Sequence, residues 1–157
     1  MNKFVLLKNI SKYNIMLKAS NYSRLHPINR NNEKKILIVD DNSSILKAGE
    51  SMIEHWGYQV CLATNGKEAL TAFKKEKPDL VLMDIKMPKL DGYEAFLKIH
   101  EKYPDAKVIL MTAYPNDPRI SDAVKLGILH VFGKPFSLRE LKDKLSQFLG
   151  RGKPNQI

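Results

Sequence analysis

Short apolar runs alternate with longer amphipathic segments from residue 34 onward, and the alternation repeats five times along the chain. Runs of four to six aliphatic and β-branched residues are typical of strands that are buried on both faces of a parallel sheet. The predicted strands are Lys35 to Val39, Tyr58 to Ala63, Asp79 to Met83, Lys107 to Met111 and Ile128 to Phe132.

Helices are predicted in the amphipathic segments, which capping and helix-breaking residues delimit. They run from about Asn42 or Ser43 to Trp56, Lys67 to Lys75, about Tyr93 to Lys102, about Pro118 to Leu126, and Leu138 to Leu149. Asn42, Asp117 and Ser137 are suitable N-caps, and a glycine follows the first, fourth and fifth helices. Strands and helices that alternate through short loops form right-handed βαβ units. We therefore predict an α/β fold with a doubly wound, five-stranded parallel sheet.

The two ends of the chain differ in composition from its middle. Residues 1–32 contain six Lys and Arg, seven Asn and no acidic residue. We expect 1–32 to be a flexible extension of a domain at 33–150, with 151–157 as a tail. Three interpretations of the extension stay open: a leader or an upstream translation start, a helix that binds a membrane surface or a partner, and an organellar targeting peptide.

The net charge of +9 belongs mainly to these ends, because residues 33–149 contain 18 basic and 17 acidic residues. No basic face for nucleic acid is therefore expected. The longest apolar runs are too short to span a bilayer. The single cysteine, Cys61, allows neither an internal disulfide nor a zinc cluster, and we expect it to be a small buried residue of the second strand. These features predict a cytoplasmic protein.

Reactive polar residues follow the carboxyl ends of four predicted strands. Asp40 and Asp41 follow the first, Asp84 the third, Thr112 the fourth, and Lys134 lies just beyond the fifth. Ligands of open α/β sheets bind outside the carboxyl ends of the strands. Each aspartate alone could be a simple cap, but all of them at one edge indicate a site for a divalent cation and a phosphoryl group.

The chemistry of these side chains suits phosphoryl transfer. The Asp84 carboxylate is a competent nucleophile toward phosphorus, and Mg²⁺ binds carboxylates and phosphate oxygens together. We expect Asp41 and Asp84 as direct ligands, Asp40 on a metal-bound water and the carbonyl of Lys86 as a further ligand. Clustered carboxylates titrate together, so at least one pKa should be raised. A cis peptide before Pro135 is expected to direct the Lys134 ammonium into the site.

These motifs resemble the receiver domain of bacterial two-component response regulators over about residues 34–149. The resemblance rests on Ile-Leu-Ile-Val-Asp40-Asp41, Asp84 with Met87-Pro88 and Asp91-Gly92, Met111-Thr112-Ala113, and Lys134-Pro135-Phe136. It implies a flavodoxin-like (βα)5 fold, Asp84 as phosphoacceptor, Asp40 and Asp41 as the acidic Mg²⁺ pocket, Thr112 as switch hydroxyl and Lys134 as clamp. The implied donor is a phosphohistidine on a sensor histidine kinase or histidine phosphotransfer protein. Lys86, Tyr114 and Leu126-Gly127 make the chain most similar to single-domain regulators of the sporulation phosphorelay.

One position departs from the family pattern. Receivers commonly have Tyr or Phe three residues before the lysine, where this chain has Val131. The neighbours His130 and Phe132 would face the opposite side of the strand. We expect a weaker or differently read conformational switch, which favours phosphotransfer over strong allosteric output.

Two further sets of residues are predicted around the acceptor. Lys86 and Tyr114 lie two residues after Asp84 and Thr112 and should overhang the phosphoryl group, which would slow attack by water. The donor is expected to dock on exposed residues at the start of the first helix and beside the lysine. This docking set is Ser43, Ile45, Leu46, Pro135 and Phe136.

The predicted function is therefore a stand-alone phosphoacceptor that is not an enzyme, and that relays its phosphoryl group or signals by contact with a downstream protein. One alternative is a receiver-like scaffold that is not phosphorylated. Another is a metal-dependent phosphohydrolase, but those enzymes need a second Asp where this chain has Lys86. A DNA-binding module after Gly150 is not expected.

Overall fold

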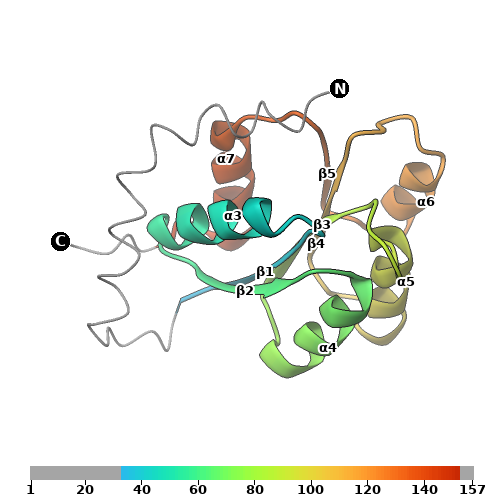
Figure 1. The fold of residues 1–157 in the computed structure, drawn as a ribbon, viewed down its shortest axis with the longest axis horizontal. Helices are drawn as coiled ribbons and strands as arrows, with labels where there is room; N and C mark the ends of the chain where they lie inside the picture. The colour runs from blue at the N-terminus through green and yellow to red at the C-terminus, as the bar shows by residue number, and fades with distance from the viewer. Residues whose placement is uncertain (1–32, 153–157) are drawn as a thin grey trace.

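The computed structural model describes residues 33–152, so the predicted extension 1–32 and most of the predicted tail lie outside the described residues. Five parallel strands form one sheet in the order β2-β1-β3-β4-β5, and helices follow the strands in alternation (Figure 1). The elements are β1 Lys35–Val39, α3 Ser43–His55, β2 Gln59–Ala63, α4 Gly66–Glu76, β3 Leu80–Asp84, α5 Gly92–Lys102, β4 Val108–Thr112, α6 Arg119–Lys125, β5 His130–Gly133 and α7 Leu138–Leu149. The predicted doubly wound α/β fold is confirmed.

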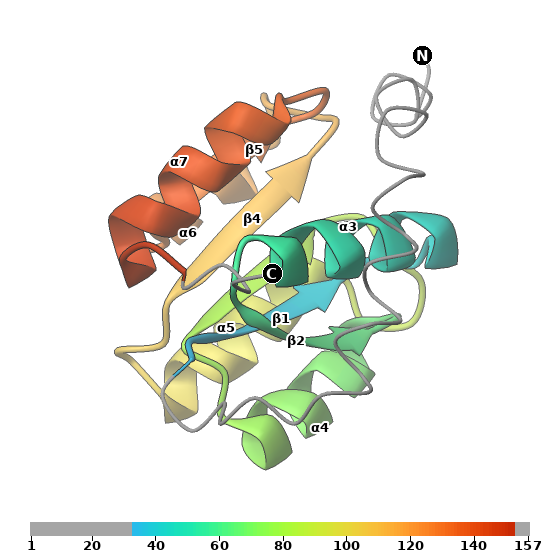
Figure 2. The ribbon, with the colours of Figure 1, turned by 90° about the vertical axis from the view of Figure 1, so that its left-hand side faces the viewer.

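The helices form a layer on each face of the sheet. Helices α3 and α7 cover one face, and α4, α5 and α6 cover the other (Figures 1 and 2). Successive side chains of a strand point to opposite faces. In β1, Ile36 and Ile38 accordingly pack on the α3 and α7 side, whereas Leu37 and Val39 pack on the other side. The continuous apolar runs are thus explained by two cores that share one sheet.

Burial differs between the central and the edge strands. Every residue of β3 and β4 is buried, whereas most of the edge strand β2 is only half-buried. Cys61 of β2 is therefore half-buried, and the prediction of a buried cysteine is wrong because an edge strand has a neighbour on one side only. Partial burial still raises the pKa of the Cys61 thiol to about 11.

Most predicted helix starts are confirmed by side-chain caps. Asn42 accepts hydrogen bonds from the amides of Ser44 and Ile45 at the start of α3, and Ser137 caps α7. The cap of α6 differs, because Pro118 already has helical dihedrals and takes the N-cap position without a side-chain bond. Asp117 lies one residue earlier and accepts from the amide of Arg119 at 3.0 Å.

Across residues 33–152, none of the helices combines the length and the apolar character that crossing a membrane requires.

Candidate functional site

The parallel register brings the predicted site residues to one edge of the sheet. Val39 of β1 pairs with Met83 of β3, so the residues that follow them, Asp40 and Asp84, lie side by side at the carboxyl ends of adjacent strands. On the other side of β3, β4 and β5 pair up to Thr112 and Gly133. The amide of Lys134 then donates to the carbonyl of Thr112 at 2.7 Å, which fixes the start of the last loop beside β4.

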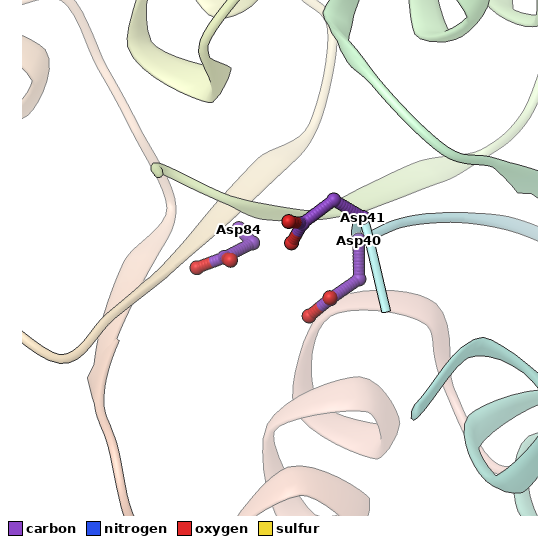
Figure 3. A group of neighbouring side chains, drawn as sticks. All are labelled: Asp40, Asp41 and Asp84. Carbon is purple, nitrogen blue, oxygen red and sulfur yellow. The ribbon is translucent and has the colours of Figure 1, made fainter. Parts of the chain in front are cut away.

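Three carboxylates converge at this edge. Asp40, Asp41 and Asp84 each offer an oxygen, and these oxygens all lie within 4.8 Å of one another (Figure 3). Asp40 is fully buried and Asp84 is 6% exposed, whereas Asp41 is exposed. The amide of Asn42 donates to one oxygen of Asp40 at 2.8 Å. The negative cluster is thus buried and hydrogen-bonded on its inner side and open to solvent at Asp41.

Lys134 supplies the positive charge of the site. Its Nζ lies 3.1 Å from Oδ1 of Asp84 and 3.4 Å from Oδ2 of Asp40. The Lys134-Pro135 peptide is cis, as predicted. The ammonium therefore bridges the two buried carboxylates and offsets part of their mutual repulsion.

The pKa of Asp84 is raised above its ordinary value of 3.8. Burial is the largest cause, because it penalises the charged carboxylate. The Lys134 ammonium opposes this rise, and the charges of Asp40 and Asp41 add to it. This direction agrees with the prediction that one pKa of the cluster is raised.

The donor set fits Mg²⁺. All three side chains offer oxygen, which this hard cation prefers, and the open side at Asp41 leaves room for the waters that Mg²⁺ retains. The participation of the Lys86 carbonyl stays a prediction.

The predicted switch hydroxyl is engaged within its own loop. Thr112 is buried, and its Oγ1 accepts a hydrogen bond from the amide of Tyr114 at 2.9 Å. Tyr114 is 55% exposed, and Nζ of Lys86 lies 3.9 Å from the centroid of its ring. The two residues predicted to flank the acceptor therefore contact each other in a cation–π pair.

Val131 lies on β5 and packs with the core under α4, α5 and α6. The rings of His130 and Phe132 meet edge to face at 4.6 Å, and Phe132 packs in the opposite core. Phe132 also stacks on Phe136 at 4.5 Å. No aromatic neighbour on the strand therefore shares the side of Val131, as the alternation predicts.

The structure changes the predicted docking set at one residue. Ser43 and Pro135 are exposed, and Ile45 and Phe136 are half-buried. Leu46 is only 3% exposed and packs in the core with Ile53, two turns further along α3. The inclusion of Leu46 is wrong, because the helical repeat turns this position toward the sheet.

A charged cluster near the site was not predicted. The Arg119 guanidinium binds the carboxylate of Asp117 through Nε and Nη2, and it binds Asp91 through Nη1. Asp91 and Arg119 are 28 residues apart. No local pattern links them, so only the packing of α5 beside α6 could reveal the contact.

Comparison with known proteins assigns residues 36–146 to the family described as the response regulator receiver domain. Sporulation initiation phosphotransferase F of Bacillus subtilis strain 168 is 40% identical over 116 residues, which are 74% of this chain and 94% of that protein. The probable transcriptional regulator ycf27 of Cyanophora paradoxa is also 40% identical, over 76% of this chain. This chain spans only 50% of that second relative.

Solved receiver structures share the fold. The CheY-like response regulator receiver domain protein of Methanospirillum hungatei JF-1 superposes with a TM-score of 0.70 at 33% identity, covering 73% of this chain and 92% of that one. Response regulator protein TrrA of Thermotoga maritima, solved in complex with Mg²⁺ and BeF, gives a TM-score of 0.67 at 38% identity. That match covers 74% of this chain and 99% of the other.

Proposed function

Because this chain belongs to the response regulator receiver domain family, we propose that it accepts a phosphoryl group on Asp84 from a phosphohistidine donor, with Mg²⁺ as cofactor. Members of this family act as phosphoacceptor signalling modules. The observation that carries the proposal is the convergence of Asp40, Asp41 and Asp84 on one another, with Lys134 bridging two of them. We assign the receiver domain to residues 33–150.

In the proposed reaction, an oxygen of Asp84 attacks phosphorus and forms a mixed anhydride. The nitrogen–phosphorus bond of the donor breaks, and its electron pair returns to the imidazole. The Lys134 ammonium, 3.1 Å from Asp84, favours the ionised nucleophile and then binds a phosphoryl oxygen. Asp41 and Asp84 would hold Mg²⁺, with Asp40 on a metal-bound water, and the bound ion would supply positive charge that offsets the repulsion between the acidic cluster and the phosphoryl group. We propose the carbonyl of Lys86 as a further ligand.

Thr112 is proposed to respond to the new charge. Its hydroxyl oxygen accepts from the Tyr114 amide in the structure, so its proton is free to be donated to a phosphoryl oxygen. Val131 supplies no aromatic ring that could follow this movement. A small conformational change suits a protein that relays its phosphoryl group or signals through one contact surface.

The pair formed by Lys86 and Tyr114 is proposed to shield the acyl phosphate. Both residues lie on loops that follow the acceptor strand and its neighbour, and Nζ of Lys86 lies 3.9 Å from the centroid of the Tyr114 ring. We propose that this pair covers the outer side of the site. Hydrolysis needs a water in line with the bond that breaks, so this cover should lengthen the lifetime of the phosphorylated form. A long lifetime favours relay of the phosphoryl group.

We propose that the donor, a sensor histidine kinase or histidine phosphotransfer protein, docks beside the site. The surface is the start of α3, with Ser43 and Ile45, and the loop with Pro135 and Phe136. This set pairs apolar groups with an exposed hydroxyl, which fits a transient contact with a helix.

The test is intact mass after incubation with acetyl phosphate, with and without Mg²⁺, on the wild type and on Asp84→Asn. Asp79→Asn is the matched control, because Asp79 precedes the same strand and pairs with Lys34 away from the site. We expect a gain of one phosphoryl group that requires Mg²⁺, persists in the control and is lost in Asp84→Asn. No gain by a folded protein that binds Mg²⁺ would favour a scaffold role instead.

A second experiment tests the donor and its surface. Transfer from a phosphohistidine-bearing phosphotransfer protein should be slower for Ile45→Glu, whereas phosphorylation by acetyl phosphate should stay unchanged. Equal slowing with both donors would show that Ile45 supports the site itself and not a docking surface.

A further inference from the structure

Arg119 ties together two loops that border the site. It is the first residue of α6, and its guanidinium binds Asp117 of the loop that follows Thr112. The same guanidinium binds Asp91, the N-cap of α5, and lies 5.5 Å from the ring centroid of Tyr93. One side chain therefore links the end of the loop 113–118 to the end of the loop 85–91.

The same two loops also meet at their beginnings. Lys86 is the second residue of the loop 85–91, and its Nζ lies over the ring of Tyr114, the second residue of the loop 113–118. Between these contacts, the Tyr114 amide donates to the Thr112 hydroxyl. The loop 113–118 is thus fixed at both ends, in an arrangement that keeps the Thr112 oxygen bonded to the Tyr114 amide.

The Arg119 guanidinium is well suited to bind two carboxylates together. A guanidinium presents a planar fork that suits two carboxylates at once. The side chains of Asp91 and Asp117 are 24% and 11% exposed, so these ion pairs are partly shielded from water. The hydrogen bonds from Arg119 lower the pKa of Asp117 to about 2, which keeps this carboxylate charged.

We propose that Arg119 is a positioning residue, whose ion pair with Asp91 holds the loop 113–118 in the resting arrangement and opposes the movement by which Thr112 reaches a phosphoryl group. This inference rests on the proposed function of Asp84 as phosphoacceptor. The bond to Asp117 is local and can order the start of α6 by itself. The bond to Asp91 adds a constraint between two separate elements, and that constraint must break or shift when the loop moves.

A contact that is made only in the resting state lowers the apparent affinity for any ligand that binds the state in which the loop has moved. If the ion pair is lost, the resting state loses its advantage and the apparent affinity for a phosphoryl mimic rises. Partly exposed ion pairs have modest strength, so the expected change is about two- to fivefold. A purely structural role for Arg119 would weaken binding or leave it unchanged, but it would not tighten it.

The experiment compares the full chain as wild type, Arg119→Gln, Asp91→Asn and the double variant. Asn still caps a helix, so Asp91→Asn removes the ion pair and keeps the cap of α5. Lys125→Gln is the matched control, because Lys125 pairs with Asp122 on the exposed side of the same helix and links no loops. Each protein is titrated with beryllofluoride at saturating Mg²⁺, and exchange of the loop amides of Ala113, Tyr114, Asn116 and Asp117 is measured without either ligand.

We expect both single variants to bind beryllofluoride about two- to fivefold more tightly than the wild type. The double variant should gain no more than either single variant, and the control should match the wild type. These loop amides, that of Tyr114 above all, should exchange faster in the variants than in the wild type. Unchanged or weaker binding, or unchanged exchange, would overturn the inference.

The two proposals fail in different ways. If the wild type does not bind beryllofluoride at all, the phosphoacceptor function is refuted. Amide exchange then still decides whether Arg119 fixes the loop. If the wild type binds and the variants behave like it, the phosphoacceptor function stands and the role of Arg119 is refuted.

Discussion

The backbone that carries Asp84 depends on the absence of a side chain at Gly92, the first residue of α5. A Cβ at this position would lie 2.1 Å from the carbonyl oxygen of Asp84 and 2.9 Å from its carbonyl carbon. Ordinary contacts between carbon and a carbonyl oxygen are about 3.3 Å or longer. Gly92→Ala must therefore displace the Asp84 carbonyl or the start of α5 by about 1 Å.

The expected cost can be estimated from this overlap. Backbone shifts forced by extra methyl groups cost about 1–3 kcal/mol and occasionally more. The better helix propensity of Ala returns about 1 kcal/mol at most. The hydrogen bond from the Gly92 amide to the Ile85 carbonyl, 2.8 Å long, would also be strained. We expect a net loss of about 1–3 kcal/mol, which lowers Tm by roughly 5–10 °C in a domain of this size.

Gly133→Ala is the matched control, because a Cβ there would find no atom within 4 Å. Its stability should change by less than about 1 kcal/mol. Urea unfolding gives the free energies of both variants. Phosphorylation by acetyl phosphate, measured where both are folded, should be about a hundredfold slower in Gly92→Ala alone, because a 1 Å misplacement of a reacting group costs about that factor. Equal stability and equal phosphorylation of the two variants would refute this reasoning.

Three further predictions concern the site itself. Lys86→Ala and Tyr114→Ala should each shorten the lifetime of the aspartyl phosphate about two- to fivefold, which is the factor that corresponds to the free energy of the cation–π contact. An unchanged rate of loss of the phosphorylated mass would contradict the shielding role. Mg²⁺ binding should weaken as the pH falls, beginning above pH 3.8, because burial raises the pKa of Asp84 and a proton then competes with the metal. Calorimetric titrations between about pH 7 and pH 4 check this, and a constant affinity would exclude it. Lys134→Met should tighten Mg²⁺ binding on the order of tenfold at neutral pH, since an ammonium 3.1 Å from Asp84 repels the cation; fluorescence titration showing equal or weaker binding would refute this.

Much of the candidate site could be predicted from sequence for a specific physical reason. Side chains that follow parallel strands must meet at one edge of the sheet, whatever the details of packing. Asp40, Asp84 and Thr112 needed only this rule and correct strand assignments. The Lys134 contacts followed from the same rule, because β5 ends beside β4.

Predictions were less accurate where they depended on which side of a helix a residue lies or on the conformation of a loop. Leu46 lies next to the polar start of α3 in sequence, yet the helical repeat places it in the core. Asp117 was expected to cap α6, but it instead binds Arg119 from the position before the cap. In both cases a shift of one residue decides the environment, and residue type alone does not specify it.

The sequence by itself determined the succession of strands and helices along the chain, the burial of both faces of the sheet, and which reactive side chains gather at its carboxyl edge. Those features follow from local hydrophobic periodicity, which each segment carries independently. Only the tertiary structure decided that Arg119 reaches Asp91, that the Tyr114 amide donates to the Thr112 hydroxyl oxygen, and that Gly92 lies against the Asp84 carbonyl. These contacts join loops from separate βα units, and their distances depend on how α5 and α6 pack on the sheet.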